Sequence, residues 1–239
     1  MIKNLSIIFP LYNEENRLLK SFNKILKYCK KEKNRKLQII FVNDGSSDKS
    51  FQLLSNFKKK NEKKFKITLV NIDQNRGKGF AINKGISYAI YDWVLTTDID
   101  HSVNLDQINN WEKKGFIKKN IFVYIGSRTH RESIVKKIFL RHLMGMVLSL
   151  FIKLFFNIHL SDTQCGFKLY KKKIAKITFK KLIRPRYEHD IEIIIRLILK
   201  KIKFLELPVK WKHEKQSKVN IFFDPFKMFM GIIILKLYY

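Results

Sequence analysis

Short apolar runs alternate with amphipathic stretches through the first part of the chain, and this alternation limits the fold more than any other feature. The apolar runs have the length of strands buried on both faces, and they lie at 5–9, 37–42, 67–70 and 93–97. The stretches between them have helical length and spacing, at 14–31, 48–60 and 79–91. The pattern predicts an α/β, Rossmann-like fold with a mostly parallel sheet and right-handed βαβ connections.

The second half of the chain is expected to be more helical. Further strands are predicted at 121–125 and 204–209, and helices at 134–157, 171–182 and 190–201. No internal repeat or low-complexity linker interrupts the chain. We therefore expect one domain over 1–218 that changes role near residue 130, followed by an amphipathic tail at 219–239.

Polar residues follow the first predicted strand, at the end where parallel sheets bind ligands. Pro10 stiffens the exit of the strand, and Tyr12 can stack on a base. Asn13 or Glu14 can hydrogen-bond a base or a ribose near the positive end of the next helix. An ordinary helix start with an Asn cap accounts for the same residues equally well.

The second and third strands are also followed by candidate binding residues. Asp44, preceded by Asn43 and followed by Gly45, can accept hydrogen bonds from a nucleotide at a tight turn. Lys78 stands between two glycines, which let the backbone approach closely and place a cation near a diphosphate. A capped turn and a basic turn are the alternative interpretations of these two segments.

The fourth strand ends in Asp98-Ile99-Asp100, the element with the clearest chemistry. Carboxylates two residues apart at a strand end can turn toward one site. Mg²⁺ and Mn²⁺ favour such a site, with a few carboxylates supplemented by phosphate oxygens of a substrate. An isolated D-x-D pattern is common, but its place as the fourth motif at successive strand ends predicts a metal site.

The composition leaves several partner classes open. A net charge of +29 would attract phosphates, nucleic acid or anionic lipid, although a bias toward Lys, Ile, Asn and Phe explains it equally well. No nucleic-acid-binding motif is present, so a basic nucleic-acid-binding module is a distant alternative and no nucleic-acid partner is expected. Cys29 and Cys165 lack metal-ligand spacing and are predicted to be packing residues. Neither a signal peptide nor a membrane-spanning helix is predicted.

The motifs PLYNEE, VNDGSSD, NRGKG, DID, GSR and DTQCGFKLY, taken in this order, resemble those of glycosyltransferase family 2. Within that family the chain is most similar to the polyprenyl-phosphate glycosyltransferases. The resemblance implies a GT-A type fold, a metal-bound D-x-D motif and inversion at the anomeric carbon. It further implies a nucleotide-sugar donor, UDP-glucose in preference to GDP-mannose, and a polyprenyl phosphate as acceptor.

The resemblance also implies roles for individual residues. Those expected to hold the nucleoside are Pro10, Tyr12, Asn13, Glu14, Asn43 and Asp44, with Lys78 near the diphosphate. Asp98 and Asp100 would bind Mg²⁺ or Mn²⁺ and, together with Asp162 and Arg128, form the catalytic set. The acceptor or its phosphate would meet Arg128, Arg141, Gln164 and Lys218, with Asp190 and Glu192 in support.

Two positions depart from the family pattern. Asn43 stands where an Asp is usual, and an uncharged side chain there is not expected to bind metal. His101 and Ser102 follow the D-x-D motif where relatives have small residues, which bears on the choice of sugar.

A lipid phosphate is a chemically suitable acceptor for such a site. A phosphate monoester is mostly dianionic at neutral pH, because its second pKa is about 6. It therefore needs positive charge around it and no strong general base. A transferase of the same fold acting on a saccharide hydroxyl would need a base, near Asp162 or Asp190. That reaction is the principal alternative.

Two Phe- and Lys-rich stretches suit a membrane surface. They span 134–160 and 221–239, and apolar faces of such helices dip about 5–10 Å into a bilayer. A core helix or an oligomer contact is the alternative. We expect the protein at the cytoplasmic face of a membrane, bound at the interface.

Overall fold

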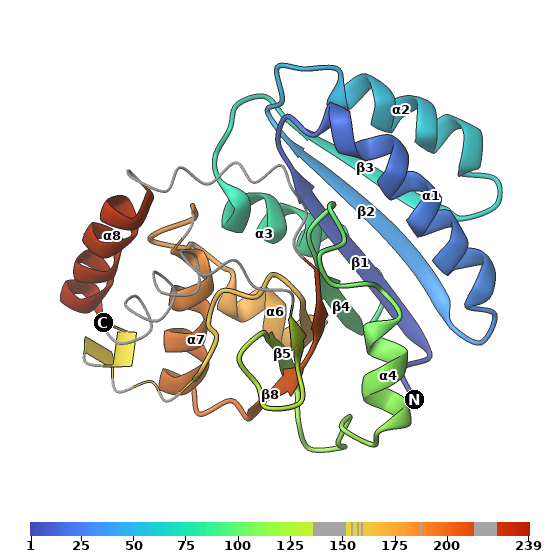
Figure 1. Ribbon diagram of the computed structural model, residues 1–239. Helices are drawn as coiled ribbons and strands as arrows, with labels where there is room; N and C mark the ends of the chain where they lie inside the picture. Colours follow the sequence, from blue (N-terminus) through green and yellow to red (C-terminus); the bar gives the residue numbers. More distant parts are fainter. Residues whose placement is uncertain (136–151, 154, 157, 159, 187, 213–223) are drawn as a thin grey trace.

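The computed structural model describes residues 1–135, 152–153, 155–156, 158, 160–186, 188–212 and 224–239. A seven-stranded sheet in the order β3-β2-β1-β4-β7-β5-β8 forms its centre (Figure 1). Every neighbouring pair in it is parallel except those of β7, which runs antiparallel to both β4 and β5. The strands are β1 (Asn4–Leu11), β2 (Lys36–Asp44), β3 (Lys66–Ile72), β4 (Trp93–Thr96), β5 (Val123–Ser127), β7 (Lys168–Lys171) and β8 (Phe204–Pro208).

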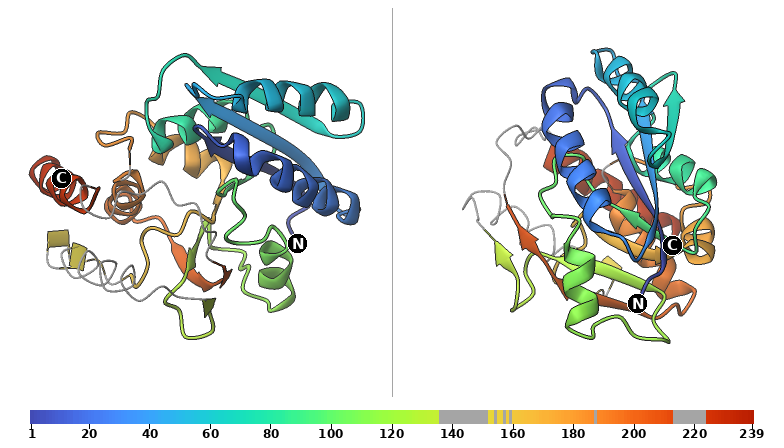
Figure 2. Two further views of the ribbon diagram at one scale, coloured as in Figure 1. Left: turned by 45° about the horizontal axis from the view of Figure 1, so that its top comes forward. Right: turned by 90° about the vertical axis from the view of Figure 1, so that its right-hand side faces the viewer.

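Helices cover both faces of the sheet, as the views in Figures 1 and 2 show. Side chains alternate along β1, so Ile7 packs in one hydrophobic cluster and Ile8 in the other. The first cluster lies under α1 (Glu15–Lys31), α2 (Ser50–Asn61) and α4 (Gln107–Lys113). The second lies under α3 (Lys78–Tyr88), α6 (Lys172–Thr178), α7 (His189–Leu199) and α8 (Asp224–Tyr238).

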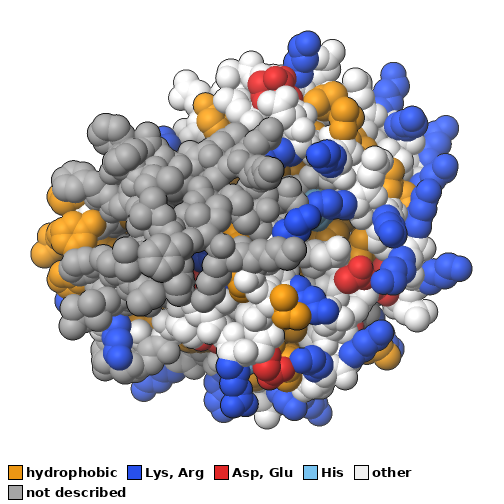
Figure 3. Space-filling view, in the orientation of Figure 1, with side chains coloured by type: hydrophobic (Ala, Val, Ile, Leu, Met, Phe, Trp, Pro, Cys, Tyr) orange, Lys and Arg blue, Asp and Glu red, His pale blue; other side chains and the backbone are white. Residues whose placement is uncertain are grey.

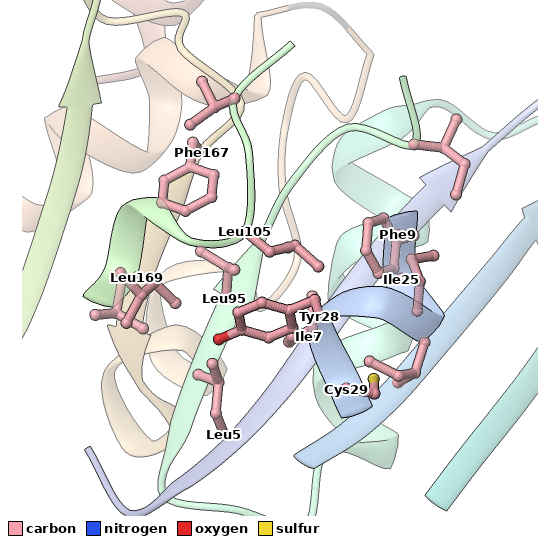
Figure 4. Close-up of a cluster of buried hydrophobic side chains, with 14 of the residues drawn as sticks. Leu5, Ile7, Phe9, Ile25, Tyr28, Cys29, Leu95, Leu105, Phe167 and Leu169 are labelled. Carbon is pink, nitrogen blue, oxygen red and sulfur yellow. The ribbon is translucent and has the colours of Figure 1, made fainter. Parts of the chain in front are cut away.

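The first cluster joins elements that are far apart in the sequence. Figure 4 shows side chains from β1, α1, β4 and β7 in contact, among them Phe9, Tyr28, Leu95 and Leu169. Cys29 and Cys165 are both buried in this cluster as free thiols. Burial raises the pKa of each thiol to about 12, which keeps both in the unreactive protonated form.

The reversed strand β7 positions the functional site. Because β7 runs antiparallel to β4 and β5, its first residue lies at the edge where those two strands end, with Lys168 opposite Thr96 of β4 and Ile125 of β5. The DTQCGF segment that precedes β7 therefore joins the polar residues at the carboxyl ends of the other strands. β7 was not predicted as a strand, because its four residues fall inside a motif and strand direction depends on tertiary pairing.

The structure confirms the predicted strands and corrects three helices. The helix expected at 171–182 covers only Lys172–Thr178, as α6. The helix expected to begin at residue 134 does not begin there, because Ile134–Val135 forms a short strand, β6, parallel to β9 (Lys210–Trp211); residues 136–151 lie outside the described part. The helix expected to reach residue 91 ends at Tyr88. The backbone N–H groups of Ile90 and Tyr91 donate instead to side chains of β2 and β1.

No helix among the described residues is long and apolar enough to cross a membrane.

Candidate active site

The four predicted motifs meet at one edge of the sheet, following β1, β2, β3 and β4. The strands are adjacent and parallel, so their carboxyl ends lie side by side. The GSR segment at the end of β5 and the DTQCGF segment before β7 reach the same edge. The structure thus brings together the described candidate residues from both halves of the chain.

Asp98 lies at the centre of this edge, directly after β4. Its Oδ1 is 2.6 Å from Nζ of Lys78, the first residue of α3. Its Oδ2 lies against the backbone of Gly166, where any Cβ atom would collide with it. The carboxylate is thus held between an ammonium group and a glycine.

Asp100 presents the second carboxylate of the D-x-D motif. Its Oδ1 accepts a hydrogen bond of 2.8 Å from the backbone N–H of Ser102. Burial, and then the negative charge of Asp98, raise the pKa of the Asp100 carboxyl above its ordinary value. Two carboxylates close enough to repel each other are suited to a divalent cation, which relieves that repulsion.

The donor set fits Mg²⁺ or Mn²⁺ bound together with a substrate. Among the described residues, no group of three or more His, Cys, Asp or Glu side chains could hold a metal ion by itself. Hard divalent cations of this kind commonly take one or two carboxylates and complete their shell with water and substrate phosphate oxygens. Asp98 and Asp100 match this pattern.

The carboxylate of Asp44 is hydrogen-bonded to the loop that follows β3. It accepts hydrogen bonds from the backbone N–H groups of Arg76 and Gly77, at 3.0 and 2.8 Å, and from the Asn75 side chain at 3.1 Å. Burial raises the pKa of Asp44 above its ordinary value, although these N–H groups oppose the shift. Asp44 therefore shapes the NRGKG loop, and a nucleoside contact remains a prediction.

Asn43 is buried next to Asp44 and is held by the neighbouring strand. Its Nδ2 donates to Oδ1 of Asn71 on β3 at 2.7 Å. The contact does not involve the amide oxygen, so the expectation that Asn43 is not a metal ligand stays a prediction.

The residues after β1 form a tight link to the loop after β2. Asn13, at φ 53°, receives a hydrogen bond from the N–H of Ser47 at Oδ1 and donates its own N–H to Ser46. Oε2 of Glu14 lies 3.3 Å from Nη1 of Arg17. Pro10 is buried in the strand, and Tyr12 is exposed. Of these, the exposed ring of Tyr12 is best placed to stack on a base.

Arg128 and Asp162 form a two-point ion pair. Nε and Nη2 of Arg128 donate to Oδ2 and Oδ1 of Asp162 at 2.7 and 2.8 Å, and the Arg128 backbone N–H donates to Oδ2 as well. Burial alone would raise the pKa of Asp162, but Arg128 outweighs it and holds the pKa below its usual value. An ionised carboxylate with both oxygens bound to Arg128 is a poor proton acceptor.

The remaining acceptor candidates are only partly described. Gln164 lies beside the start of α8, with Nε2 3.8 Å from Sδ of Met228. Arg141 and Lys218 lie outside the described residues, and their roles remain predictions.

A buried charge cluster lies behind the site. Lys168 Nζ is ion-paired with Asp190, and Nε2 of His189 is 3.4 Å from the same carboxylate oxygen. Burial would raise the pKa of Asp190, but His189, Lys168 and Lys78 outweigh it and lower the pKa to about 2. Glu192 is fully buried and accepts hydrogen bonds from the backbone N–H groups of Ile183 and Arg184. Both acidic residues thus support the structure around the site.

His101 belongs to the core. It has φ 56°, is buried, and its ring lies 5.6 Å from that of Phe9 on β1. Burial lowers the pKa of His101 to about 4, so the ring is neutral.

Two functional positions were not singled out from the sequence. Gly166 confines Asp98, and Lys168 anchors Asp190. A glycine directly before Phe167 and Lys168 was a usable signal, since glycine next to a strand often marks a close backbone approach. Nothing in the local pattern distinguishes Lys168 from the many solvated lysines of this chain.

Comparisons with known proteins identify the family of the chain. The family model "Glycosyl transferase family 2" matches residues 6–179. The dolichyl-phosphate beta-glucosyltransferase ALG5A of Trichomonas vaginalis is 35% identical over 91% of this chain and 68% of that protein. The dolichyl-phosphate beta-glucosyltransferase of Saccharomyces cerevisiae is 29% identical over 98% of this chain and 75% of that protein.

Solved structures show the same GT-A type fold. Glucosyl-3-phosphoglycerate synthase from Mycobacterium tuberculosis in complex with UDP superposes with a TM-score of 0.67 at 14% identity, over 98% of this chain and 80% of that one. The mannosyltransferase PcManGT from Pyrobaculum calidifontis, in complex with GDP-Man and Mn²⁺, gives 0.63 at 15% identity, over 91% and 59%. The chain is therefore a glycosyltransferase that belongs to glycosyl transferase family 2, and within it to the group of the dolichyl-phosphate beta-glucosyltransferases.

Proposed function

We propose that this protein transfers glucose from UDP-glucose to a polyprenyl phosphate at a membrane surface. The relatives named above support the sugar and the acceptor class. The observation that carries the acceptor chemistry is the two-point ion pair between Arg128 and Asp162. Because Asp162 is committed to Arg128 and its pKa is lowered, the site favours a nucleophile that arrives already ionised.

The proposed reaction needs no proton transfer. A phosphate oxygen of the acceptor forms a bond to the anomeric carbon, and the bond from that carbon to the β-phosphate oxygen of UDP breaks. The bonding electrons leave with UDP, and attack from the opposite face inverts the configuration. We propose that the Arg128 guanidinium offsets the charge of the incoming phosphate and that Lys78 offsets the charge of the diphosphate. Bound Mg²⁺ or Mn²⁺ would offset the charge on the departing UDP.

A transfer assay tests the proposal. Purified protein with Mn²⁺ and radiolabelled UDP-glucose is expected to move label to a polyprenyl phosphate in the organic phase, and EDTA is expected to abolish the transfer. GDP-mannose in parallel tests the sugar. The free polyprenol is the matched control, because it differs from the acceptor only by the phosphate. Equal transfer to the polyprenol would contradict an ionised nucleophile and point to a hydroxyl acceptor.

We further propose that α8 holds the protein at the membrane interface. It exposes Met230, Ile234, Leu237 and Tyr238, while Ile232 and Leu235 are buried against the second core cluster. Figure 3 shows hydrophobic side chains gathered at the edge of the molecule where Figure 1 places α8, and Lys and Arg side chains mainly on the right and lower parts of the same view. A basic surface beside an apolar helix face suits anionic lipid.

Hydrogen bonds fix this helix to the catalytic domain. The Tyr239 hydroxyl, just beyond the end of α8, donates to Glu192 and accepts from Arg196 of α7. At the other end, Met228 contacts Gln164, the acceptor candidate. The helix would therefore bring the lipid surface close to the acceptor site.

Paired substitutions test this placement. Ile234→Ser with Leu237→Ser is expected to weaken binding to vesicles containing anionic lipid at least about tenfold, since each side chain buries apolar area in the bilayer. Leu19→Ser with Phe51→Ser is the matched control, because these residues of α1 and α2 are also exposed. Co-sedimentation measures both. Equal vesicle binding by the two double variants would refute a membrane role of α8.

A further inference from the structure

We infer that Lys78 competes with the divalent cation for Asp98, so that metal and nucleotide-sugar bind cooperatively through this one side chain. The inference rests on the metal site of the proposed function. It adds that Lys78 lowers the affinity for metal until the diphosphate of the donor draws the ammonium group away. The inference is based on the position of Lys78 between Gly77 and Gly79, two glycines with closely packed backbones.

The backbone around Lys78 has little freedom. Gly77 has φ 98°, and a Cβ atom there would lie 2.8 Å from Arg186 and Pro185. Gly79 donates its N–H to the Pro185 carbonyl at 2.7 Å and packs against His189. Two close-packed glycines therefore fix the start of α3, and with it the direction from which Lys78 reaches Asp98.

The carboxylate of Asp98 is equally constrained. Lys78 Nζ lies 2.6 Å from Oδ1, and Gly166 lies directly against Oδ2. A divalent cation on this carboxylate would lie close to the ammonium group, and like charges at such a separation repel strongly in a partly buried site. Both side chains are partly exposed, at 32% and 41%, so neither is sealed off from a ligand.

A nucleoside diphosphate would resolve the competition. Its oxygens can accept from the Lys78 ammonium at the start of α3, and they can also coordinate the cation. Moving Lys78 onto the diphosphate leaves Asp98 to the metal. By reciprocity, the metal then raises the affinity for the nucleotide by the same factor.

The test measures Mn²⁺ binding directly, by calorimetry or by electron paramagnetic resonance, with and without UDP. Lys78→Gln is expected to bind Mn²⁺ alone about tenfold more tightly than the unsubstituted protein, and the gain in Mn²⁺ affinity on adding UDP is expected to shrink by a similar factor. Lys84→Gln is the matched control, because Lys84 is an exposed lysine of the same helix. Lys78→Arg should restore the weak binding of Mn²⁺ alone.

Two results would overturn the inference. One is that Lys78→Gln binds Mn²⁺ alone no more tightly than Lys84→Gln does. The other is that the tighter binding survives Asp98→Asn in the Lys78→Gln protein, since the metal would then lie elsewhere. These measurements use no acceptor, so a failed glucosyl transfer with cooperative binding of Mn²⁺ and UDP would refute the proposed acceptor and leave this inference standing.

Discussion

Replacement of Gly166 with alanine is expected to lower kcat/KM for glucosyl transfer about a hundredfold while the protein stays folded, because a misplacement of about 1 Å costs that much. A Cβ atom at position 166 would collide with Oδ2 of Asp98 and lie 2.9 Å from its Cγ. Asp98 would have to turn away, and both its contact with Lys78 and its metal-binding position would change. The backbone of Gly166 is not in the left-handed region, so alanine adds no conformational strain.

Gly115→Ala is the informative control for this prediction. Gly115 has φ 67°, and a Cβ atom there would meet no atom of the described residues within 4 Å, the reverse of the situation at Gly166. It is expected to lose about 1–2 kcal/mol of stability through strain and to keep its activity. Thermal unfolding and the transfer assay together separate the two effects. A Gly166→Ala protein with unchanged kcat/KM would show that Asp98 does not need its present orientation.

Replacement of Asp190 with asparagine is expected to lower the free energy of unfolding by about 3–5 kcal/mol. Lys168 has only 2% of its side chain exposed, and its ammonium group pairs with Asp190. Asparagine keeps the shape of the side chain but leaves this buried cation without its counter-charge. Urea unfolding measures the loss. Lys168→Met combined with Asp190→Leu is expected to recover much of it, since it removes both charges.

The exposed ion pair between Lys31 and Asp106 provides the comparison. Its side chains are 65% and 39% exposed, and the nitrogen and oxygen are 3.1 Å apart. Asp106→Asn is expected to change the unfolding free energy by less than about 1 kcal/mol. Equal losses for Asp190→Asn and Asp106→Asn would contradict the role of burial.

The same buried pair, Lys168 with Asp190, has a defined pH dependence. The pKa of Asp190 is about 2 in the folded protein, against an ordinary 3.8. Its stabilising contribution is therefore complete above pH 3.8 and is lost as the pH falls toward 2. The difference in stability between the unsubstituted protein and Asp190→Asn should follow this course.

Much of the first half of the fold could be predicted from the sequence. β1 and β2 are buried on both faces, so their apolar runs are nearly continuous and easy to recognise. β7 escaped recognition because it is short and its direction is set by β4 and β5, which no local pattern encodes. Ile134 and Val135 of β6 were predicted to be helical, because two apolar residues followed by lysines fit both the helical and the strand period.

The sequence predicted which residues belong to the site better than it predicted the contacts between those residues. Asp98 and Asp100 could be placed because a D-x-D motif after a buried strand has a clear chemical use. The pairing of Lys78 with Asp98, and of Arg128 with Asp162, could not, since each joins residues from different loops. Asp44 was expected to contact the nucleoside. In the structure its carboxylate accepts hydrogen bonds from the backbone of a neighbouring loop.

The reversed strand β7 also determines how the chain could be divided. Among the described strands, β5 pairs only with β7 and β8, which both come later in the chain, and β4 would have an unpaired edge without β7. A fragment ending near residue 130 would carry an unpaired strand and an open sheet edge, both of which favour aggregation. The two halves differ in the substrate they are proposed to hold, but they contribute strands to one sheet, so neither half completes its sheet without the other.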